Sequence, residues 1–292
     1  MTQQPLSRRI RAASLALIAG TGLAAGAAQA EEKGTVELAY VEWASEVAST
    51  NVIAAVLEQA GYEVELTSLS AAAMFQALST GDADAIVAAW LPTTHADYME
   101  RVGDSVDDLG PNLEGTKLGL VVPAYTDVDS IAELDANADA FDGTITGIDP
   151  GAGLMSLTEE VVESYDLEEV DLQSGSGATM TAALDSAIKN EQDIVVTGWT
   201  PHWMFARWDL KYLEDPKNVY GGAEQINTVA REGLKEDMPG AYAILDAFEW
   251  TPEQMGEVML MNQSGDAEPY ENAKQWVAEN QDVVQEWLPA ES

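Results

Sequence analysis

The sequence predicts an α/β protein built from two similar lobes, and an internal repeat is the main reason. Two apolar runs end alike, at Trp, then Pro, then His, over 86–95 and 194–203. Strand-like and helix-like segments precede both runs, which favours two related α/β lobes over a solenoid of short repeats. Upstream, four apolar residues recur with identical spacing: Val64, Leu66, Met74 and Leu78 return as Val170, Leu172, Met180 and Leu184.

The first half of the chain alternates between strand and helix. Gly61 ends the first expected helix, and the run Thr80-Gly81-Asp82 ends the second. Strands that alternate with helices imply a parallel sheet covered by those helices. The expected strands are 36–40, 64–66 and 86–90, and the expected helices are 47–60 and 71–78.

The second half repeats this order after a strand at 117–123 and a weakly periodic crossover at 124–143. Its expected strands are 144–148, 170–172 and 194–198, and its expected helices are 154–164 and 178–190. Residues 226–230 read as a return crossover, and 239–288 has helical spacing. We therefore expect lobe 1 over 31–122, lobe 2 over 123–225, and over 226–292 a return crossover with helices that pack mainly on lobe 1. Two parallel-sheet lobes joined by two such crossovers form a hinged cleft.

Residues 1–30 are predicted to be a cleaved signal peptide. Arg8, Arg9 and Arg11 precede a short apolar stretch, and Ala28-Gln29-Ala30 has the small residues of a cleavage site. The apolar stretch is too short for a spanning helix. No cysteine is present, which excludes a lipid anchor at the cleavage site. We expect an exported, soluble, periplasmic protein, and the sequence leaves the general secretory and twin-arginine routes open.

The charge balance is strongly acidic. All 51 Asp and Glu residues follow residue 30, whereas three of the 13 basic residues precede it, so the mature chain carries a formal charge of −41. Such a surface repels phosphates and excludes nucleic acid as a partner. Dense carboxylates favour a halophilic protein that stays hydrated in high salt, with an ordinary acidic secreted protein as the alternative.

Three of the eight tryptophans stand where a ligand is expected. Trp43, Trp90 and Trp199 each end an apolar strand, and open α/β sheets bind ligands at the carboxyl ends of their strands. Rings from facing lobes would surround one ligand. The other five lie in helical patterns and are expected to pack in the core or at interfaces: Trp203, Trp208, Trp250, Trp276 and Trp287.

A quaternary ammonium is the ligand class that three indoles favour. It has no N–H to donate, so a protein holds it through cation–π attraction, about 0.5–2 kcal/mol per ring. A sugar would also stack on indoles, but it needs several polar side chains around it.

A glycine-rich segment at 147–154 joins an expected strand to an expected helix, where free amide N–H groups form an anion site. The same segment could instead be a dinucleotide-binding fingerprint, but Ser156 stands at the position of its third glycine. A tight turn without any ligand is the second alternative. His95 and His202 each follow a strand-end Trp, and lone histidines are more often structural. One beside an anion site would donate to a carboxylate.

No metal, cofactor or catalytic residue is predicted. Residues 135–140 begin like a calcium loop but lack its central glycine, and Thr146 stands where a bidentate Glu belongs. The sequence has no nucleophile elbow, no phosphate-binding loop and no cysteine chemistry.

Five segments together resemble the glycine betaine-binding proteins of ABC importers: 40–43, 48–53, 89–95, 147–153 and 197–205. The resemblance implies a two-lobed periplasmic-binding-protein fold of type II. It implies a cage of Trp43, Trp90 and Trp199 around a trimethylammonium group. It assigns the ligand carboxylate to His95 and to the backbone amides of Gly153 and Leu154, and leaves His202 structural.

The predicted function is therefore capture of glycine betaine as an osmoprotectant and its delivery to an inner-membrane permease driven by a separate ATPase. We expect a monomer without catalytic activity. Choline, carnitine or proline betaine are alternative ligands, and an exported enzyme acting on a betaine or choline ester is the alternative from another class.

Overall fold

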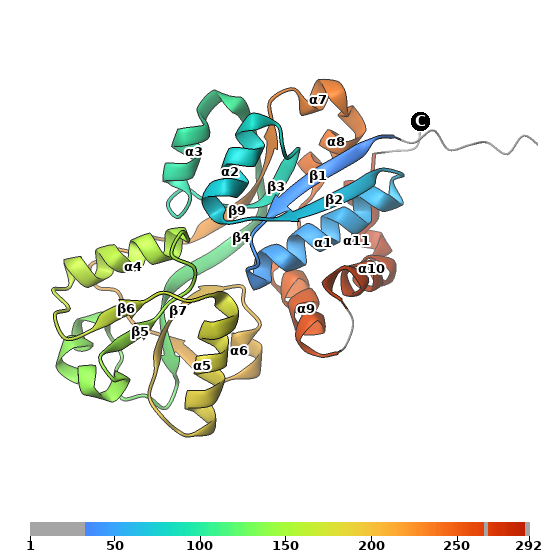
Figure 1. The fold of residues 1–292 in the computed structure, drawn as a ribbon. Coiled ribbons are helices and arrows are strands. Elements are labelled where there is room, and N and C mark those ends of the chain that lie inside the picture. The colour runs from blue at the N-terminus through green and yellow to red at the C-terminus, as the bar shows by residue number, and fades with distance from the viewer. Residues whose placement is uncertain (1–32, 266–267, 290–292) are drawn as a thin grey trace, which may run out of the picture. The chain divides into compact units, whose positions relative to one another are not determined.

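The computed structural model describes residues 33–265 and 268–289 (Figure 1). The signal peptide predicted at 1–30 lies outside these residues. Within the described ranges, the helices are all too short or too polar to cross a membrane.

The first three strands form a parallel set in the order β2-β1-β3. The helix α1 is buried nearly all round, because it lies between these strands and the helices at the end of the chain (Figure 1). The predicted alternation is confirmed here to within a few residues: β1 (Thr35–Tyr40), α1 (Ala44–Gln59), β2 (Glu63–Ser68), α2 (Ala71–Thr80) and β3 (Ala85–Leu91).

The second set of three strands has the same topology. Its order is β6-β5-β7, all parallel, so in both sets the first strand along the chain lies in the middle. The internal repeat in the sequence therefore corresponds to a repeat in strand order. The elements are β5 (Thr144–Thr146), α4 (Gly153–Ser164), β6 (Asp171–Gln173), α5 (Gly177–Lys189) and β7 (Val195–Thr200).

Two antiparallel strands connect the sets, and they correct the expectation of purely parallel sheets. The strand β4 (Val106–Pro123) pairs with β9 (Glu224–Arg231) along its first part and with β7 along its second. In turn, β9 pairs antiparallel with β3. The sheet is mixed because β9 runs antiparallel to both β3 and β4, and β4 runs antiparallel to β7.

The prediction also missed the first half of β4. Gly110, Pro111 and Gly115 interrupt its sequence, and glycine and proline read as turns rather than strand. In the structure they lie among the register shifts at which β4 bulges against β9. After β4, the weakly periodic crossover forms short 3-10 turns, η2 (Ile131–Glu133) and η3 (Asp135–Phe141).

The C-terminal helices pack on α1 and confirm the core role of three tryptophans. Trp250 and Trp287 contact Phe248, with ring centroids 5.5 and 4.9 Å away, and Trp276 lies 5.9 Å from Trp250. The helices are α7 (Leu234–Asp237), α8 (Pro239–Ala247), α9 (Pro252–Gln263), α10 (Pro269–Glu279) and α11 (Gln281–Trp287). The remaining elements are α3 (Ala96–Val102), η1 (Gly103–Ser105), α6 (Met204–Arg207) and β8 (Leu210–Tyr212), which pairs with β4.

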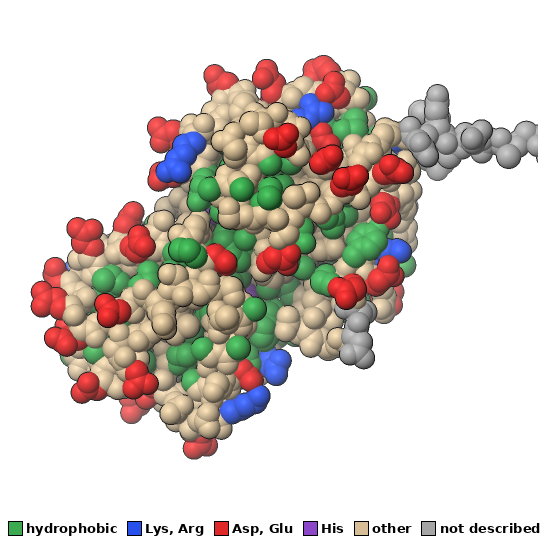
Figure 2. Space-filling view, viewed as in Figure 1, with side chains coloured by type: hydrophobic (Ala, Val, Ile, Leu, Met, Phe, Trp, Pro, Cys, Tyr) green, Lys and Arg blue, Asp and Glu red, His purple; other side chains and the backbone are tan. Residues whose placement is uncertain are grey.

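Acidic side chains are spread widely over the visible face, and basic ones are few and scattered (Figure 2). This distribution agrees with a sequence that has 51 acidic and 13 basic residues.

Candidate functional site

The turn after β3 brings Trp90 and His95 together. His95 accepts the backbone N–H of Trp90 on Nδ1 at 3.0 Å, which leaves Nε2–H as the ring's donor. Burial lowers the pKa of His95 to about 4, so the ring is neutral at physiological pH.

A buried carboxylate on β9 fixes the same turn. Glu224 accepts the backbone N–H groups of Thr93 at 2.6 Å and of Thr94 at 2.9 Å, and the Thr94 hydroxyl as well. The sequence did not predict a role for Glu224, because no local pattern links this residue to a turn 130 residues earlier. It holds the loop that positions His95.

Trp43 stands between β1 and α1. Its indole N–H donates to Asp149 Oδ2 at 2.9 Å, and its ring is buried. The turn beneath it is tied by Glu46, whose Oε2 accepts the Val41 N–H at 2.7 Å. Burial raises the pKa of Glu46 to about 8.

Trp199 comes from β7 and is held in a similar way. Its indole N–H donates to Ser45 Oγ, at the start of α1, at 3.2 Å. His202 meets this ring edge-on, with centroids 4.5 Å apart and planes at 86°. The Nδ1 atom of His202 accepts the Met204 N–H at 3.1 Å, and burial lowers the pKa of His202 to about 3.

The start of α4 supplies the backbone donors. Ala152 is the N-cap, and no side chain caps the helix, so the amides of Gly153 and Leu154 lie in its open first turn. Gly153 packs against the turn after β3: a Cβ at this position would lie 2.1 Å from the carbonyl oxygen of Thr94. Only glycine permits that approach.

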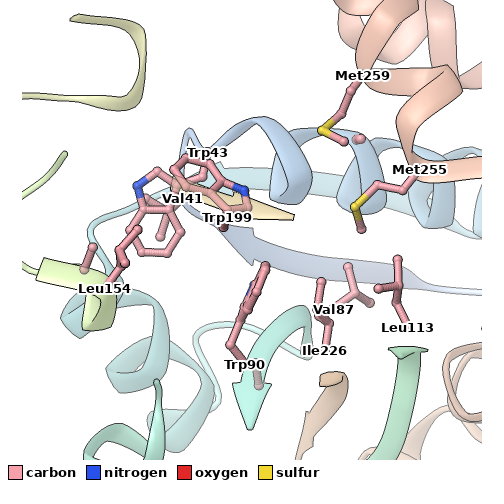
Figure 3. Packing of buried hydrophobic residues seen from close by; sticks show 14 of the residues in the cluster. Val41, Trp43, Val87, Trp90, Leu113, Leu154, Trp199, Ile226, Met255 and Met259 are labelled. Atoms are coloured by element: carbon pink, nitrogen blue, oxygen red, sulfur yellow. The ribbon is translucent and has the colours of Figure 1, made fainter. Parts of the chain in front are cut away.

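The three indoles, His95 and the start of α4 line one small pocket, with a cavity volume of about 30 Å³. All six residues predicted for the site line it, and Figure 3 shows the three indoles and Leu154 near one another. The complete lining is Trp43, Ser45, Trp90, Thr94, His95, Leu118, Ile148, Ala152, Gly153, Leu154 and Trp199.

Five of these lining residues were not predicted. Four of them lie close in the sequence to predicted site residues, so this proximity could have predicted them: Ser45, Thr94, Ile148 and Ala152. Leu118 comes from β4, which passes the site between the two sets of strands, and nothing in the local sequence marked it.

A larger cavity of about 480 Å³ shares the Trp199 ring but offers a different environment. It contains His202 and the pair Trp203 and Trp208, whose rings are already covered by the Arg207 guanidinium at 5.8 and 5.1 Å. The smaller pocket has no Lys or Arg in its lining, so no cation of its own lining covers its indole rings.

The chain matches the family described as the substrate-binding domain of ABC-type glycine betaine transport systems, over residues 34–279. A glycine betaine/carnitine transport binding protein of Listeria monocytogenes is 51% identical over 163 residues, which is 54% of each chain. The match thus spans about half the length of that curated relative.

Solved structures show the same fold. The lactococcal OpuAC complex with glycine betaine matches with a TM-score of 0.83 and 47% identity, over 88% of this chain and all of that one. A choline-binding protein of an ABC transporter, in complex with choline, matches with a TM-score of 0.81 and 28% identity, over 87% of this chain and 91% of that one. These matches confirm the predicted periplasmic-binding-protein fold. The chain belongs to the family of substrate-binding domains of ABC-type glycine betaine transport systems.

Proposed function

We propose that this protein binds glycine betaine and delivers it to an ABC-type permease. The observation that carries the proposal is the convergence of three buried indoles, one neutral histidine and one open helix start on a single small pocket. The indoles suit a cation without donors, and the histidine and amides suit an anion. Glycine betaine carries both groups.

In the proposed binding mode, the trimethylammonium group lies among Trp43, Trp90 and Trp199. Each ring contributes about 0.5–2 kcal/mol through its face. The carboxylate accepts hydrogen bonds from Nε2–H of His95 and from the amides of Gly153 and Leu154. The N-terminal dipole of α4 adds to this attraction.

The protein acts in this proposal as a binder without catalysis. Residues 1–30 direct export to the periplasm, where the protein works as a monomer and meets an inner-membrane permease driven by a separate ATPase. The acidic surface suits a halophilic setting, in which imported betaine offsets external osmotic pressure.

We further propose that the ligand lies between two lobes, 31–122 and 123–225, with 226–292 packed mainly on the first. Neither lobe holds the full set of six residues, so ligand would shift the population toward a closed state. Solution scattering should show a smaller radius of gyration with saturating betaine, starting from ligand-free protein. Identical curves would contradict the lobe assignment.

Calorimetric titration with glycine betaine, choline, carnitine, proline betaine and glycine tests the ligand. Glycine betaine should bind with micromolar affinity, about −8 kcal/mol. Glycine should bind far more weakly, because an indole cage cannot replace the hydration of its N–H donors. Equal affinity for the two would refute the cage. Recovery of chemically unchanged betaine would exclude a betaine-ester enzyme as the alternative.

Choline is the second candidate, because a relative of this fold was solved with choline bound and the indoles accept any trimethylated head. The pocket favours betaine through His95 and the α4 amides, for which choline has no carboxylate. Tighter binding of choline than of betaine in the same titration would reverse this preference.

A further inference from the structure

Two of the proposed cage indoles are each held by a side chain from the opposite part of the chain. Trp43 follows β1 in the first set of strands and donates to Asp149, which precedes α4 in the second. Trp199 ends β7 in the second set and donates to Ser45, at the start of α1 in the first. The two hydrogen bonds run in opposite directions between the two halves.

An indole has one polar atom, so a hydrogen bond to Nε1–H fixes which way the ring face points. The Trp43 bond ends on a carboxylate at 2.9 Å, whereas the Trp199 bond ends on a hydroxyl at 3.2 Å. Hydrogen bonds to charged groups are roughly twice as strong as neutral ones. A carboxylate that draws on the N–H also raises the electron density of the ring, which strengthens its hold on a cation.

The Asp149 loop meets the first half at two further points. The Tyr98 hydroxyl donates to the carbonyl of Gly151 at 2.8 Å, and Thr94 packs against Gly153. The segment that offers its amides to an anion is therefore tied to the first half by two contacts close to the bond that orients Trp43. These ties exist only while the two halves are together.

We propose that Asp149 is a positioning residue that latches the closed, ligand-bound state through the indole N–H of Trp43. It does not line the pocket, so it acts through the ring rather than on the ligand. Ser45 and Trp199 form the uncharged counterpart, with a smaller effect. The inference rests on the proposed betaine cage.

A double-mutant cycle tests the latch. Asp149→Ala, Trp43→Phe and the double variant are titrated with glycine betaine, and dissociation is followed by stopped-flow tryptophan fluorescence. Trp43→Phe keeps a ring face and removes the N–H. Asp149→Ala should weaken binding roughly tenfold, the size expected for a charge-assisted hydrogen bond, mainly through faster dissociation. In the Trp43→Phe background it should add less than twofold.

Three further variants extend the double-mutant cycle and control for it. Asp149→Asn keeps an acceptor and should recover part of the loss, and it carries the test if Asp149→Ala does not fold. Ser45→Ala should weaken binding by only a few-fold and should lose that effect in a Trp199→Phe background. Asp139→Ala removes an equal charge from an exposed position and should change nothing.

An equal effect of Asp149→Ala in both backgrounds would overturn the latch, and so would an unchanged dissociation rate. The proposed cage fails separately: it is wrong if Trp43→Ala binds betaine as well as the natural chain. Loss of binding in Trp43→Ala, without coupling between Asp149 and Trp43, would leave the cage standing and remove only the latch.

Discussion

The turns after β3 and β7 begin alike and end differently. Each has a strand-end tryptophan and a histidine whose Nδ1 accepts a backbone N–H. His95, five residues after its tryptophan, takes that N–H from Trp90 itself and lines the small pocket. His202, three residues after its tryptophan, takes it from Met204 and lies in the neighbouring cavity. The two turns thus differ both in the spacing from tryptophan to histidine and in the cavity that the histidine lines.

This asymmetry suits a ligand with one cationic head and one carboxylate. Both turns give an indole to the pocket, so a bound cation would be met from both halves. Only the first gives a histidine donor, and in the proposed binding mode the start of α4 completes the anion site from the other half. Such a ligand has no second carboxylate to which a second histidine in the pocket could donate a hydrogen bond.

The largest expected effect separates the two histidines. His95→Ala should lower glycine betaine affinity by about tenfold to a hundredfold, since a hydrogen bond to a charged group contributes roughly 1.5–3 kcal/mol. Choline affinity should change little. His202→Ala should leave the ratio of the two affinities unchanged and lower the melting temperature, because it removes a buried ring that packs on Trp199. Titration of both ligands measures the ratio. If His202 controls it, the assignment of the two turns is reversed.

The two tryptophans should behave alike, in contrast to the histidines. Trp90→Ala and Trp199→Ala should each weaken betaine binding by about tenfold, near 1–2 kcal/mol for a lost ring. Trp276→Ala is the matched control, because its ring is buried among the C-terminal helices and away from the pocket. It should lower thermal stability and leave the affinity unchanged. Loss of binding in folded Trp276→Ala alone would contradict the cage.

Much of this comparison could be predicted from sequence, because the repeat places both tryptophans at strand ends. Apolar periodicity located most strands and helices, and their alternation predicted the parallel pairing within each set of three strands. The six site residues that the sequence and its family resemblance indicated do line one pocket.

What escaped prediction depends on partners far apart in the chain. The antiparallel direction of β4 and β9 is a property of the assembled sheet. The first half of β4 was not predicted, because its glycines and proline are typical of turns. Glu224 and Asp149 each bond to a segment more than 100 residues away. No local period records such a contact.

A smaller effect should distinguish the supports of the two turns. Glu224→Gln keeps one acceptor oxygen but weakens the hydrogen bonds from the backbone of Thr93 and Thr94, so His95 should be less well placed. Betaine affinity should fall several-fold, with choline affinity nearly unchanged. The matched change in the second turn is Tyr212→Phe, which removes a 2.7 Å contact with Thr200 and should leave both affinities alone. A loss of choline affinity equal to that of betaine would show that Glu224 supports the fold rather than the histidine.

A separate effect, on stability rather than on affinity, concerns the first strand-to-helix turn of each half. The first half buries Glu46 there, whereas the second has the half-buried Asp149. Burial raises the pKa of Glu46 from 4.5 to about 8, so between these pH values the native state keeps a proton that the unfolded chain releases. The contribution of Glu46 to the free energy of unfolding is therefore largest below pH 4.5, and it is lost as the pH rises towards 8.

Glu46→Gln has no proton to lose, so its melting temperature relative to the natural chain should rise between pH 5 and pH 8. One pKa unit corresponds to about 1.4 kcal/mol, and a change of that size moves the melting temperature of a chain this long by roughly 3–6 °C. Glu42→Gln, on the exposed surface nearby, is the control and should show no such trend. A pH-independent difference for Glu46→Gln would mean that Glu46 is already ionised in the folded protein. The first turn would then hold a buried charge and would resemble the second more closely than its burial indicates.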